Sequence, residues 1–537
     1  MPSPAGEEIF SFQKAVHFRR WVFFLLPVIG GLASGVLVRW LAPEAGGEGT
    51  DAAIDAFHNK RGMVRSRVPF VKALTSIIVL ATGGSVGREG PIAQIGGGFG
   101  SIVANFFRLS DRERRILLLA GIGGGLSAIF RAPLGGALIA IEILYKEDLE
   151  TDALIPTVVS SIISYIIFTS IFGYQPILSF SQYSFHDPRE LIFYAGLALV
   201  SVPLGILYIK CYYLVRDKIF KPLNLPTYIK PMLGGVLVGL IGLAFPQVYS
   251  GGWGWIQQAM SGNLAIWLMA SLIFAKIIAT SISLGSGASG GIFGPTIYIG
   301  AMIGGVVGFL GNKYFPDIVQ QPDAFVVVGM GAFLAGVANA PIGALLMCSE
   351  MTKGYGLIAP LMLVSTIAIL FTRRYGIFEY QVQNRFHSPA HIGDFTINVL
   401  AEMKVKDVFK PKALIPIPRT LPYAEIKRLF AESTEECFPV VDEQGRLVGV
   451  ISWEQARPIA FQTGMERLLI AQDLMVPAVT VTPENSLYEA LVKFLESNLE
   501  ELMVVSSENP NQVLGVIRHE DLIYAYNQEI LRRKSQG

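Results

Sequence analysis

The sequence predicts an all-α, multi-pass membrane domain made of two repeats, followed by a soluble α/β pair. Charged residues make up only 16% of the 537 residues, against about 25% in a typical soluble protein, and they gather after Glu402. Long apolar runs fill the chain before that point, and both parts contain an internal repeat. These three observations exclude a secreted enzyme, a disordered protein and a single soluble domain.

The first apolar run begins at Trp21 and follows the basic residues Lys14, Arg19 and Arg20. The run carries no small-residue cleavage site, so we do not interpret it as a signal peptide. Because basic residues favour the cytoplasmic side of a span, we expect residues 1–20 to form a cytoplasmic N-terminus, and the C-terminus to be cytoplasmic too. The net charge of +1 gives no reason to expect a nucleic-acid partner.

The predicted spans are apolar runs that can cross about 30 Å of hydrocarbon, which takes about 20 helical residues. In chain order they are Trp21–Leu41, Leu191–Leu214, Pro231–Phe245, Ala265–Leu284, Ala324–Met347 and Leu357–Phe371. Further runs are interrupted by Gly and Pro: Val68–Leu80, Pro91–Phe107, Leu117–Tyr145 and Gly294–Leu310. Unpaired backbone in a membrane is tolerated only where protein buries it or where it lines a cavity. The interruptions favour a transport pathway; the alternative is glycine used for close helix packing.

Two pairs of similar segments define the membrane repeat. Gly90–Gly96 resembles Gly294–Gly300, 204 residues later. Ala132–Glu142 resembles Ala340–Glu350, 208 residues later. Duplicated halves with broken helices are typical of secondary transporters and their relatives, which bind their substrate at the interface of the repeats.

A second repeat lies in the soluble part. Each copy is predicted as a strand, an amphipathic helix, an apolar strand, a polar turn and another apolar strand. Gly449 and Gly515 stand at matching places, 66 residues apart. We therefore expect a membrane domain at 21–390, a linker at 391–401, and soluble units at 402–460 and 461–537.

The segment Gly83–Pro91 holds a charged pair between glycines, deep in apolar sequence. An intramembrane carboxylate is costly, so Glu89 is a candidate functional residue. Pro91 suits the first turn of a helix, and a helix start directs N–H groups and a positive dipole end at an anion. Glu89 would compete with the anion for these donors. The alternative is a structural pair of Arg88 and Glu89.

The segment Gly285–Pro295 is a similar turn before a helix that starts with proline. It contains no charge, so backbone N–H groups would hold any anion. Alone it is also compatible with a packing turn, but it is the repeat partner of the first segment.

These segments resemble the signatures of the CLC family of chloride channels and proton-coupled chloride exchangers, at Gly87–Pro91 and Gly285–Pro295. The unit after Glu402 resembles the paired CBS domains of many family members. The resemblance extends from Trp21 to Tyr526. It implies a membrane domain of two inverted repeats with broken, tilted helices, plus a soluble α/β CBS pair. It also implies a homodimer in the lipid bilayer, with a separate chloride pathway in each subunit.

The resemblance also implies roles for individual residues. Glu89 matches the family's external gating glutamate, which blocks the pathway when ionised and opens it when protonated or displaced. The implied anion-binding residues are Gly87, Arg88, Glu89, Gly90, Ile292 and Phe293.

The chain departs from the family pattern at the central anion site. The family's serine, which contacts that anion, is replaced by Glu48 when the distance to Lys72 is counted without gaps. A carboxylate beside a central anion repels it unless it is protonated. Glu48 is therefore turned away, or takes part in proton handling, or weakens anion occupancy; the alternative is a solvated loop residue.

Two further departures concern protons and the inner gate. Exchangers of the family carry an internal proton-transfer glutamate, and alignment gives Ile143 at that position, with Glu142 beside it. An apolar residue there favours passive conduction, although some exchangers also lack the glutamate. The family's inner-gate tyrosine aligns with Phe378, or with Tyr380 after a two-residue slip.

The soluble pair is a candidate nucleotide site. CBS pairs often bind adenine nucleotides with Ser or Thr and Asp after the last strand, and Asp521 is the matching candidate. The usual hydroxyl is missing beside it, so a dimerising, regulatory or structural module is the alternative.

The sequence favours a CLC-type chloride channel gated by Glu89. The first alternative is a proton-coupled chloride antiporter, and the second is a nucleotide-regulated sensor with vestigial transport. Nothing resembles an enzyme or a metal site, because no nucleophile–base constellation or metal-ligand cluster is present. The cysteines have no metal-binding spacing and are interpreted as packing residues: Cys211, Cys348 and Cys437.

Overall fold

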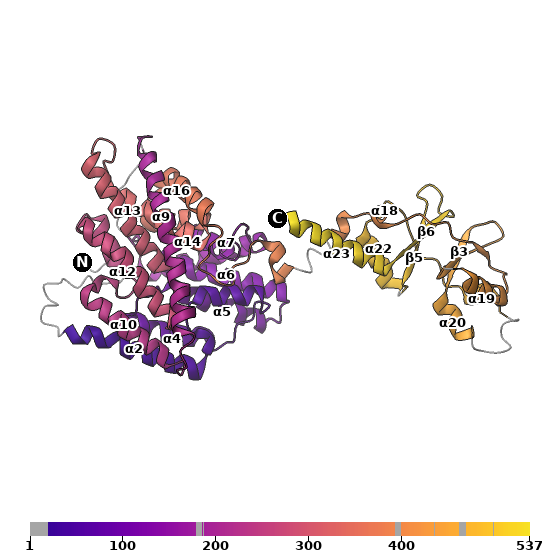
Figure 1. Cartoon of the computed structure of the whole chain (residues 1–537), viewed down its shortest axis with the longest axis horizontal. Helices are drawn as coiled ribbons and strands as arrows, with labels where there is room; N and C mark the ends of the chain where they lie inside the picture. The colour runs from indigo at the N-terminus through magenta and orange to yellow at the C-terminus, as the bar shows by residue number, and fades with distance from the viewer. Residues whose placement is uncertain are drawn as a thin grey trace. The chain divides into compact units, whose positions relative to one another are not determined.

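The computed structural model describes residues 20–178, 185, 187–391, 399–433, 435–460, 469–497 and 499–536. The chain divides into two compact units, residues 1–390 and 391–537. Each unit is described by itself (Figure 1). The predicted cytoplasmic N-terminus and most of the predicted linker lie outside the described residues.

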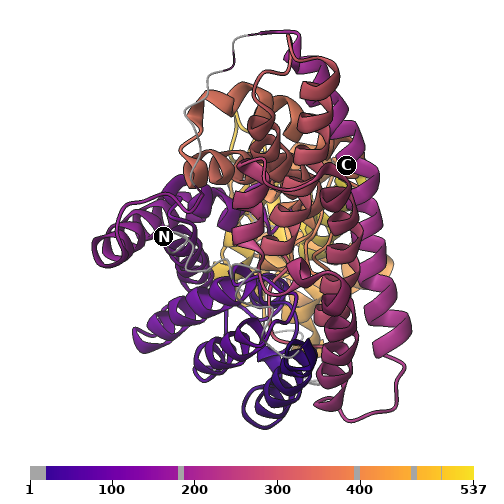
Figure 2. The same cartoon turned by 90° about the vertical axis from the view of Figure 1, so that its left-hand side faces the viewer.

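The first unit is helical, and its helices cross at many angles instead of standing parallel (Figure 2). The first half contains α2 (Arg20–Leu41), α3 (Gly49–His58), α4 (Val68–Ala81), α5 (Glu89–Phe106), α6 (Asp111–Phe130), α7 (Pro133–Glu142) and α8 (Leu154–Phe172). A long helix, α9 (Glu190–Tyr213), continues into the π-helical segment η3 (Leu214–Phe220). The second half contains α10 (Ile229–Ala244), α11 (Trp253–Met260), α12 (Ile266–Gly285), α13 (Phe293–Tyr314), α14 (Pro322–Ala338), α15 (Pro341–Thr352) and α16 (Ile358–Thr372).

The two halves repeat each other helix by helix. α5 and α13 begin 204 residues apart, and α7 and α15 begin 208 residues apart. In both halves the sixth helix ends at a residue with positive φ, Arg131 at 54° and Asn339 at 52°. In both halves a proline then opens the next helix. The predicted repeat therefore covers whole helical halves and not only the signature segments.

Two expectations about helices need correction. Ala324–Met347 is not one span, because Asn339 turns the chain and Pro341 cannot continue the ladder of hydrogen bonds. The helix α8 was not predicted, although its apolar run is long enough to cross a membrane. Six helices in the described part of the chain meet that criterion: 21–41, 151–172, 190–220, 266–285, 293–314 and 355–372.

Glycines bring matching helix pairs into close contact. A Cβ on Gly96 of α5 would lie 2.1 Å from the carbonyl oxygen of Gly121 on α6. A Cβ on Gly300 of α13 would lie 2.4 Å from that of Gly329 on α14. For these residues close packing is the right interpretation, as small residues allow backbones to approach in membrane proteins.

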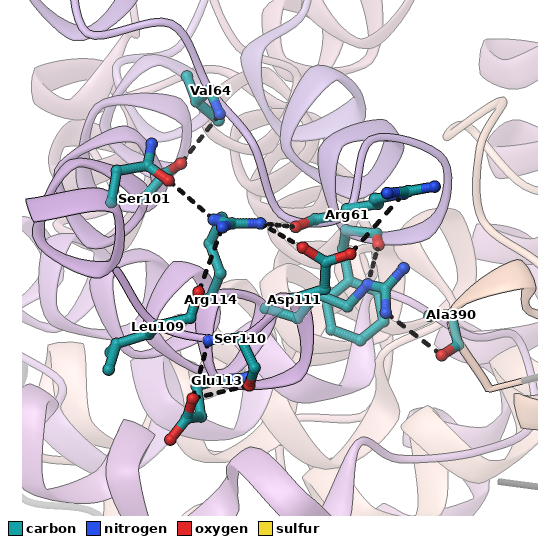
Figure 3. A network of polar contacts seen from close by, with 12 residues as sticks. Arg61, Val64, Ser101, Leu109, Ser110, Asp111, Glu113, Arg114 and Ala390 are labelled. Atoms are coloured by element: carbon teal, nitrogen blue, oxygen red, sulfur yellow. Dashed lines mark hydrogen bonds and ion pairs between the residues drawn. The ribbon is translucent and has the colours of Figure 1, made fainter. Parts of the chain in front are cut away.

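Polar side chains hold the turn between α5 and α6 (Figure 3). Ser110 and Glu113 form a capping box at the start of α6. Arg114 donates to Asn105 Oδ1 at 2.9 Å and to Asp111 Oδ1 at 2.6 Å. The same guanidinium reaches the Arg61 carbonyl oxygen at 3.3 Å, which ties this turn to the one after α3.

The second unit contains two sheets with the same topology. In the first, β1 (Ile417–Pro418) runs parallel to β2 (Cys437–Val441), which pairs antiparallel with β3 (Leu447–Ser452). In the second, β4 (Thr480–Val481), β5 (Glu501–Val505) and β6 (Val513–Arg518) repeat this order. The helices α19 (Tyr423–Glu432) and α20 (Trp453–Ala460) belong to the first copy, and α22 (Leu487–Ser497) and α23 (His519–Gln536) to the second. The predicted α/β repeat is confirmed.

The two copies exchange their opening helices. α18 (Val405–Val408) places Val405 in the core of the second sheet, with Val481 and Phe494. α21 (Ala471–Leu474) places Ala471 in the core of the first sheet, with Ile417. Each sheet thus depends on sequence from the other copy, and the pair packs as one unit.

Candidate anion pathway

Three helix starts converge where the two signature segments meet. The Gly87 N–H donates to the Gly291 carbonyl at 2.7 Å. The Gly49 N–H donates to the Gly290 carbonyl at 3.2 Å, and the Gly290 N–H returns a bond to Gly47 at 3.1 Å. The second segment therefore lies between two strips of the first half, and the N-termini of α3, α5 and α13 share one region. Helix N-termini attract anions.

Glu89 lies at this junction with its carboxylate on the start of α13. The side chain is fully buried, and Oε2 accepts the Gly294 N–H at 3.0 Å. A Cβ on Gly294 would lie 2.8 Å from Oε2, and one on Gly87 would lie 2.1 Å from it. Only glycine leaves room for the carboxylate in both places. Glu89 takes an N–H donor that an anion would otherwise bind.

Arg88 lies beside this carboxylate but does not form a tight pair with it. Its Nε is 3.9 Å from Glu89 Oε1, and its guanidinium lies over the Trp253 ring, 5.5 Å from the centroid. The Arg88 side chain is 26% exposed. An anion approaching Glu89 from this side meets a positive charge first.

Glu48 caps α3 and is not a solvated loop residue. It is 8% exposed, and its Oε2 accepts the Asp51 N–H at 2.5 Å. Its Oε1 is buried and accepts no hydrogen bond from any residue that the structure describes. A Cβ on Gly90 would lie 2.4 Å from that oxygen. Glu48 therefore faces the start of α5.

The inner-gate candidates occupy different environments. Phe378 is 2% exposed and stacks on Phe293, with ring centroids 5.9 Å apart. Tyr380 is 41% exposed, and its backbone N–H donates to Asp51 Oδ1 at 3.0 Å. Phe378 is thus the side chain that contacts the start of α13, as expected from the ungapped register.

Ile143 and Glu142 lie away from the junction. Ile143 is fully buried, and its carbonyl accepts a bond from Gln381 at 3.0 Å. The Glu142 carboxylate accepts the N–H groups of Ile342 at 3.1 Å and Gly343 at 2.6 Å, at the start of α15. Both Glu142 oxygens are therefore occupied in capping a helix.

A cavity of about 600 Å³ lies beside Phe378. Its wall comes from α9, η3, the residue Lys146 after α7 and the segment after α16. The ionisable residues in the wall are Lys146, Lys210, Lys218, Arg374, Asp217 and Glu379. The excess of positive side chains raises the local concentration of anions, so this cavity is a candidate entrance.

Two buried lysines hold the loops that open α3 and α11, and sequence reasoning missed them. Lys72 donates to the carbonyls of Ala45 at 3.1 Å and Gly47 at 2.8 Å. Lys276 donates to those of Val248 at 2.9 Å and Ser250 at 2.7 Å. The two lysines are 204 residues apart, the same offset as the signature segments. That offset was the available indication.

Comparison with known proteins agrees with the geometry. The profile of the family described as "Voltage gated chloride channel" matches residues 30–373, and that of the CBS domain matches 405–456 and 471–528. The chain belongs to the voltage-gated chloride channel (CLC) family. Its fold is that of the family: a helical membrane domain of two repeats followed by a CBS pair.

Curated relatives of this CLC chain cover most of the membrane domain. A "Putative chloride channel protein ClcB-like" of Ralstonia nicotianae is 30% identical over 347 residues, 64% of this chain and 80% of the relative. An "H(+)/Cl(-) exchange transporter ClcA" of Vibrio campbellii is 32% identical over 346 residues, 63% and 74% of the two chains.

Solved structures show the same fold. A slow cyanobacterial Cl−/H+ antiporter is 26% identical, with a TM-score of 0.62 over 67% of this chain and 86% of that one. A eukaryotic CLC transporter is 20% identical, with a TM-score of 0.55 over 93% and 89%. The second match includes the soluble unit and supports the fold alone.

In the CBS pair, Asp521 caps a helix. Its Oδ2 accepts the Arg518 N–H at 3.0 Å, at the start of α23. In the same unit Cys437 is buried, and burial together with the charge of Glu501 raises the pKa of its thiol. Cys437 is thus a packing residue. Nucleotide binding at Asp521 stays a prediction.

Proposed function

We propose that this CLC protein is a proton-coupled chloride antiporter. The passive channel that the sequence favoured is not confirmed, and the antiporter alternative fits the relatives better. The Vibrio relative is named an exchange transporter, and the cyanobacterial structure is an antiporter. The channel hypothesis rested on Ile143, and the absence of a carboxylate there excludes only one proton route.

The observation that carries the proposal is the Glu89 carboxylate on the Gly294 N–H. Ionised Glu89 competes with chloride for this donor, and protonated Glu89 gives it up. Chloride binding and proton release are then alternatives at one place, which is the condition for exchange. The finer features expected for the family belong to the same proposal: a homodimer with a pathway in each subunit, and cytoplasmic termini.

The test is the reconstituted full-length protein in liposomes with a chloride gradient. The wild type should move protons against their gradient as chloride flows. Glu89→Gln mimics the neutral side chain, so chloride should still flow while proton movement is lost. A wild type that carries chloride without moving protons would restore the channel interpretation.

A further inference from the structure

Glu48 has an unusual combination of burial and incomplete hydrogen bonding. It is 8% exposed, its Oε2 is held by the Asp51 N–H, and its Oε1 has no hydrogen-bond donor among the described residues. A buried carboxylate oxygen without a donor is costly, and such groups are retained at functional sites. That oxygen faces Gly90, one residue after Glu89.

Glu48 and Glu89 approach the same short strip from two sides. Glu89 Oε2 lies against Gly87, where a Cβ would be 2.1 Å away. Glu48 Oε1 lies against Gly90, where a Cβ would be 2.4 Å away. Between the two carboxylates is the backbone that begins α5. Rotation of the Glu89 side chain off the Gly294 N–H is the movement that its gating role already requires.

Asp51 continues the series away from Glu89. Its N–H donates to Glu48, and its Oδ1 accepts the Tyr380 N–H at 3.0 Å, which leaves Oδ2 to carry a proton. The charges of Glu48 and Glu379 both act on Asp51. Glu379 lines the 600 Å³ cavity, and its side chain is 50% exposed. The acidic groups thus run from the cavity to the gate.

Other ionisable groups face this series from each packed element. Lys72 of α4 acts on Glu48, and Arg216 of η3 pairs with Glu379 at 2.7 Å. The remaining groups are Asp55 of α3, which pairs with Lys60 at 2.5 Å, and Tyr208 and Tyr212 of α9, which feel the charge of Glu48. Lys72 and Arg216 offset part of the negative charge, so that the carboxylates are not all forced to be neutral.

We propose that Glu379, Asp51 and Glu48 carry protons between the cavity and Glu89, taking the place of the glutamate that Ile143 lacks. This rests on the antiporter function proposed above. In the inward-to-outward direction, Glu379 takes a proton from cavity water, and the proton passes to Asp51, to Glu48 and to Glu89. Each donor returns to its carboxylate form, only O–H bonds are exchanged, and water bridges any gap longer than a hydrogen bond.

The test uses full-length protein in liposomes, with proton and chloride movement measured together. Glu48→Ser keeps an oxygen that can cap α3 but holds no transferable carboxyl proton. Chloride should still flow, while protons moved per chloride should fall by about tenfold or more. Asp51→Asn should lower the same ratio. Asp55→Asn is the matched control, because Asp55 is on the same helix but outside the series, and it should leave the ratio unchanged.

The outcomes separate this route from the function on which it rests. A coupled wild type with uncoupled Glu48→Ser and Asp51→Asn supports the route. A coupled wild type whose Glu48→Ser and Glu48→Gln variants remain coupled overturns the route and leaves the antiporter in place. A wild type that moves no protons overturns both proposals.

Discussion

At the residue scale, the pathway depends on two buried ammonium groups that bind no ion. Lys72 and Lys276 are both fully buried, and each donates to two carbonyls in the loop before a short helix. The loop held by Lys72 presents Glu48, and the loop held by Lys276 leads to Trp253, on which Arg88 lies. Each lysine thus positions one side of the junction.

Replacing Lys72 by Met should destabilise the membrane unit. The change leaves the Ala45 and Gly47 carbonyls buried without their donor, and each such group costs about 1–3 kcal/mol. We expect a loss of about 2 kcal/mol or more in the free energy of unfolding in detergent, and a similar loss for Lys276→Met. Lys230→Met is the control, since its ammonium makes one exposed contact at 3.4 Å. Equal stability of all three variants would contradict the positioning role.

The residues of the junction differ in how far sequence could predict them. Glu89 was predictable, because a carboxylate between glycines in apolar sequence has few structural explanations. The place of Glu48 was predictable by counting, but not its orientation, which depends on Gly290 pairing from the other half of the chain. The lysines were missed because a single Lys in an apolar run was not tested against the repeat offset.

At the element scale, α7 and α15 cap each other. Glu142 at the end of α7 accepts N–H groups of Ile342 and Gly343, and Glu350 at the end of α15 accepts those of Leu134 at 3.2 Å and Gly135 at 2.8 Å. The donors are the first-turn N–H groups that a helix leaves unpaired. The exchange ties the two halves together, and it explains why the Pro-to-Glu segments are alike.

Glu142→Gln should therefore affect stability and not proton coupling. The amide oxygen can keep one of the two bonds, so we expect a loss of about 1–2 kcal/mol in unfolding free energy, matched by Glu350→Gln. The ratio of protons to chloride should equal that of the wild type. Loss of coupling in Glu142→Gln but not in Glu350→Gln would assign Glu142 the internal proton position after all.

Element boundaries show where periodicity and length were insufficient. The run Ala324–Met347 is apolar throughout, so hydropathy alone does not reveal that Asn339 and Pro341 divide it into α14 and α15. The matching break at Arg131 was visible only because a charge interrupts the run. In the soluble unit the strands were predictable from their alternation, but the exchange of α18 and α21 was not, since four-residue helices carry too little pattern.

At the scale of the whole molecule, the anion pathway is contained in the first compact unit. The residues that meet at the junction come from 47–49, 87–90, 290–294 and 378, all before the division after Ala390. The soluble pair cannot be divided in the same way, because each sheet takes a core residue from the other copy. A truncation that removes one CBS copy should therefore unfold the other, whereas removal of both should not.

Deletion of residues 402–537 should leave chloride transport intact. The membrane unit keeps its helices, its two lysines and Glu89, and it has its own hydrophobic core. Chloride flux and proton coupling in liposomes should be close to those of the full chain, measured at equal amounts of reconstituted protein. Deletion of residues 461–537 is the informative comparison, since it exposes the apolar core around Ile417 that Ala471 and Leu474 cover, and it should lower the yield of folded protein. A tail-free protein that is folded by size-exclusion chromatography but carries no chloride would contradict this prediction and favour a soluble pair on which transport depends.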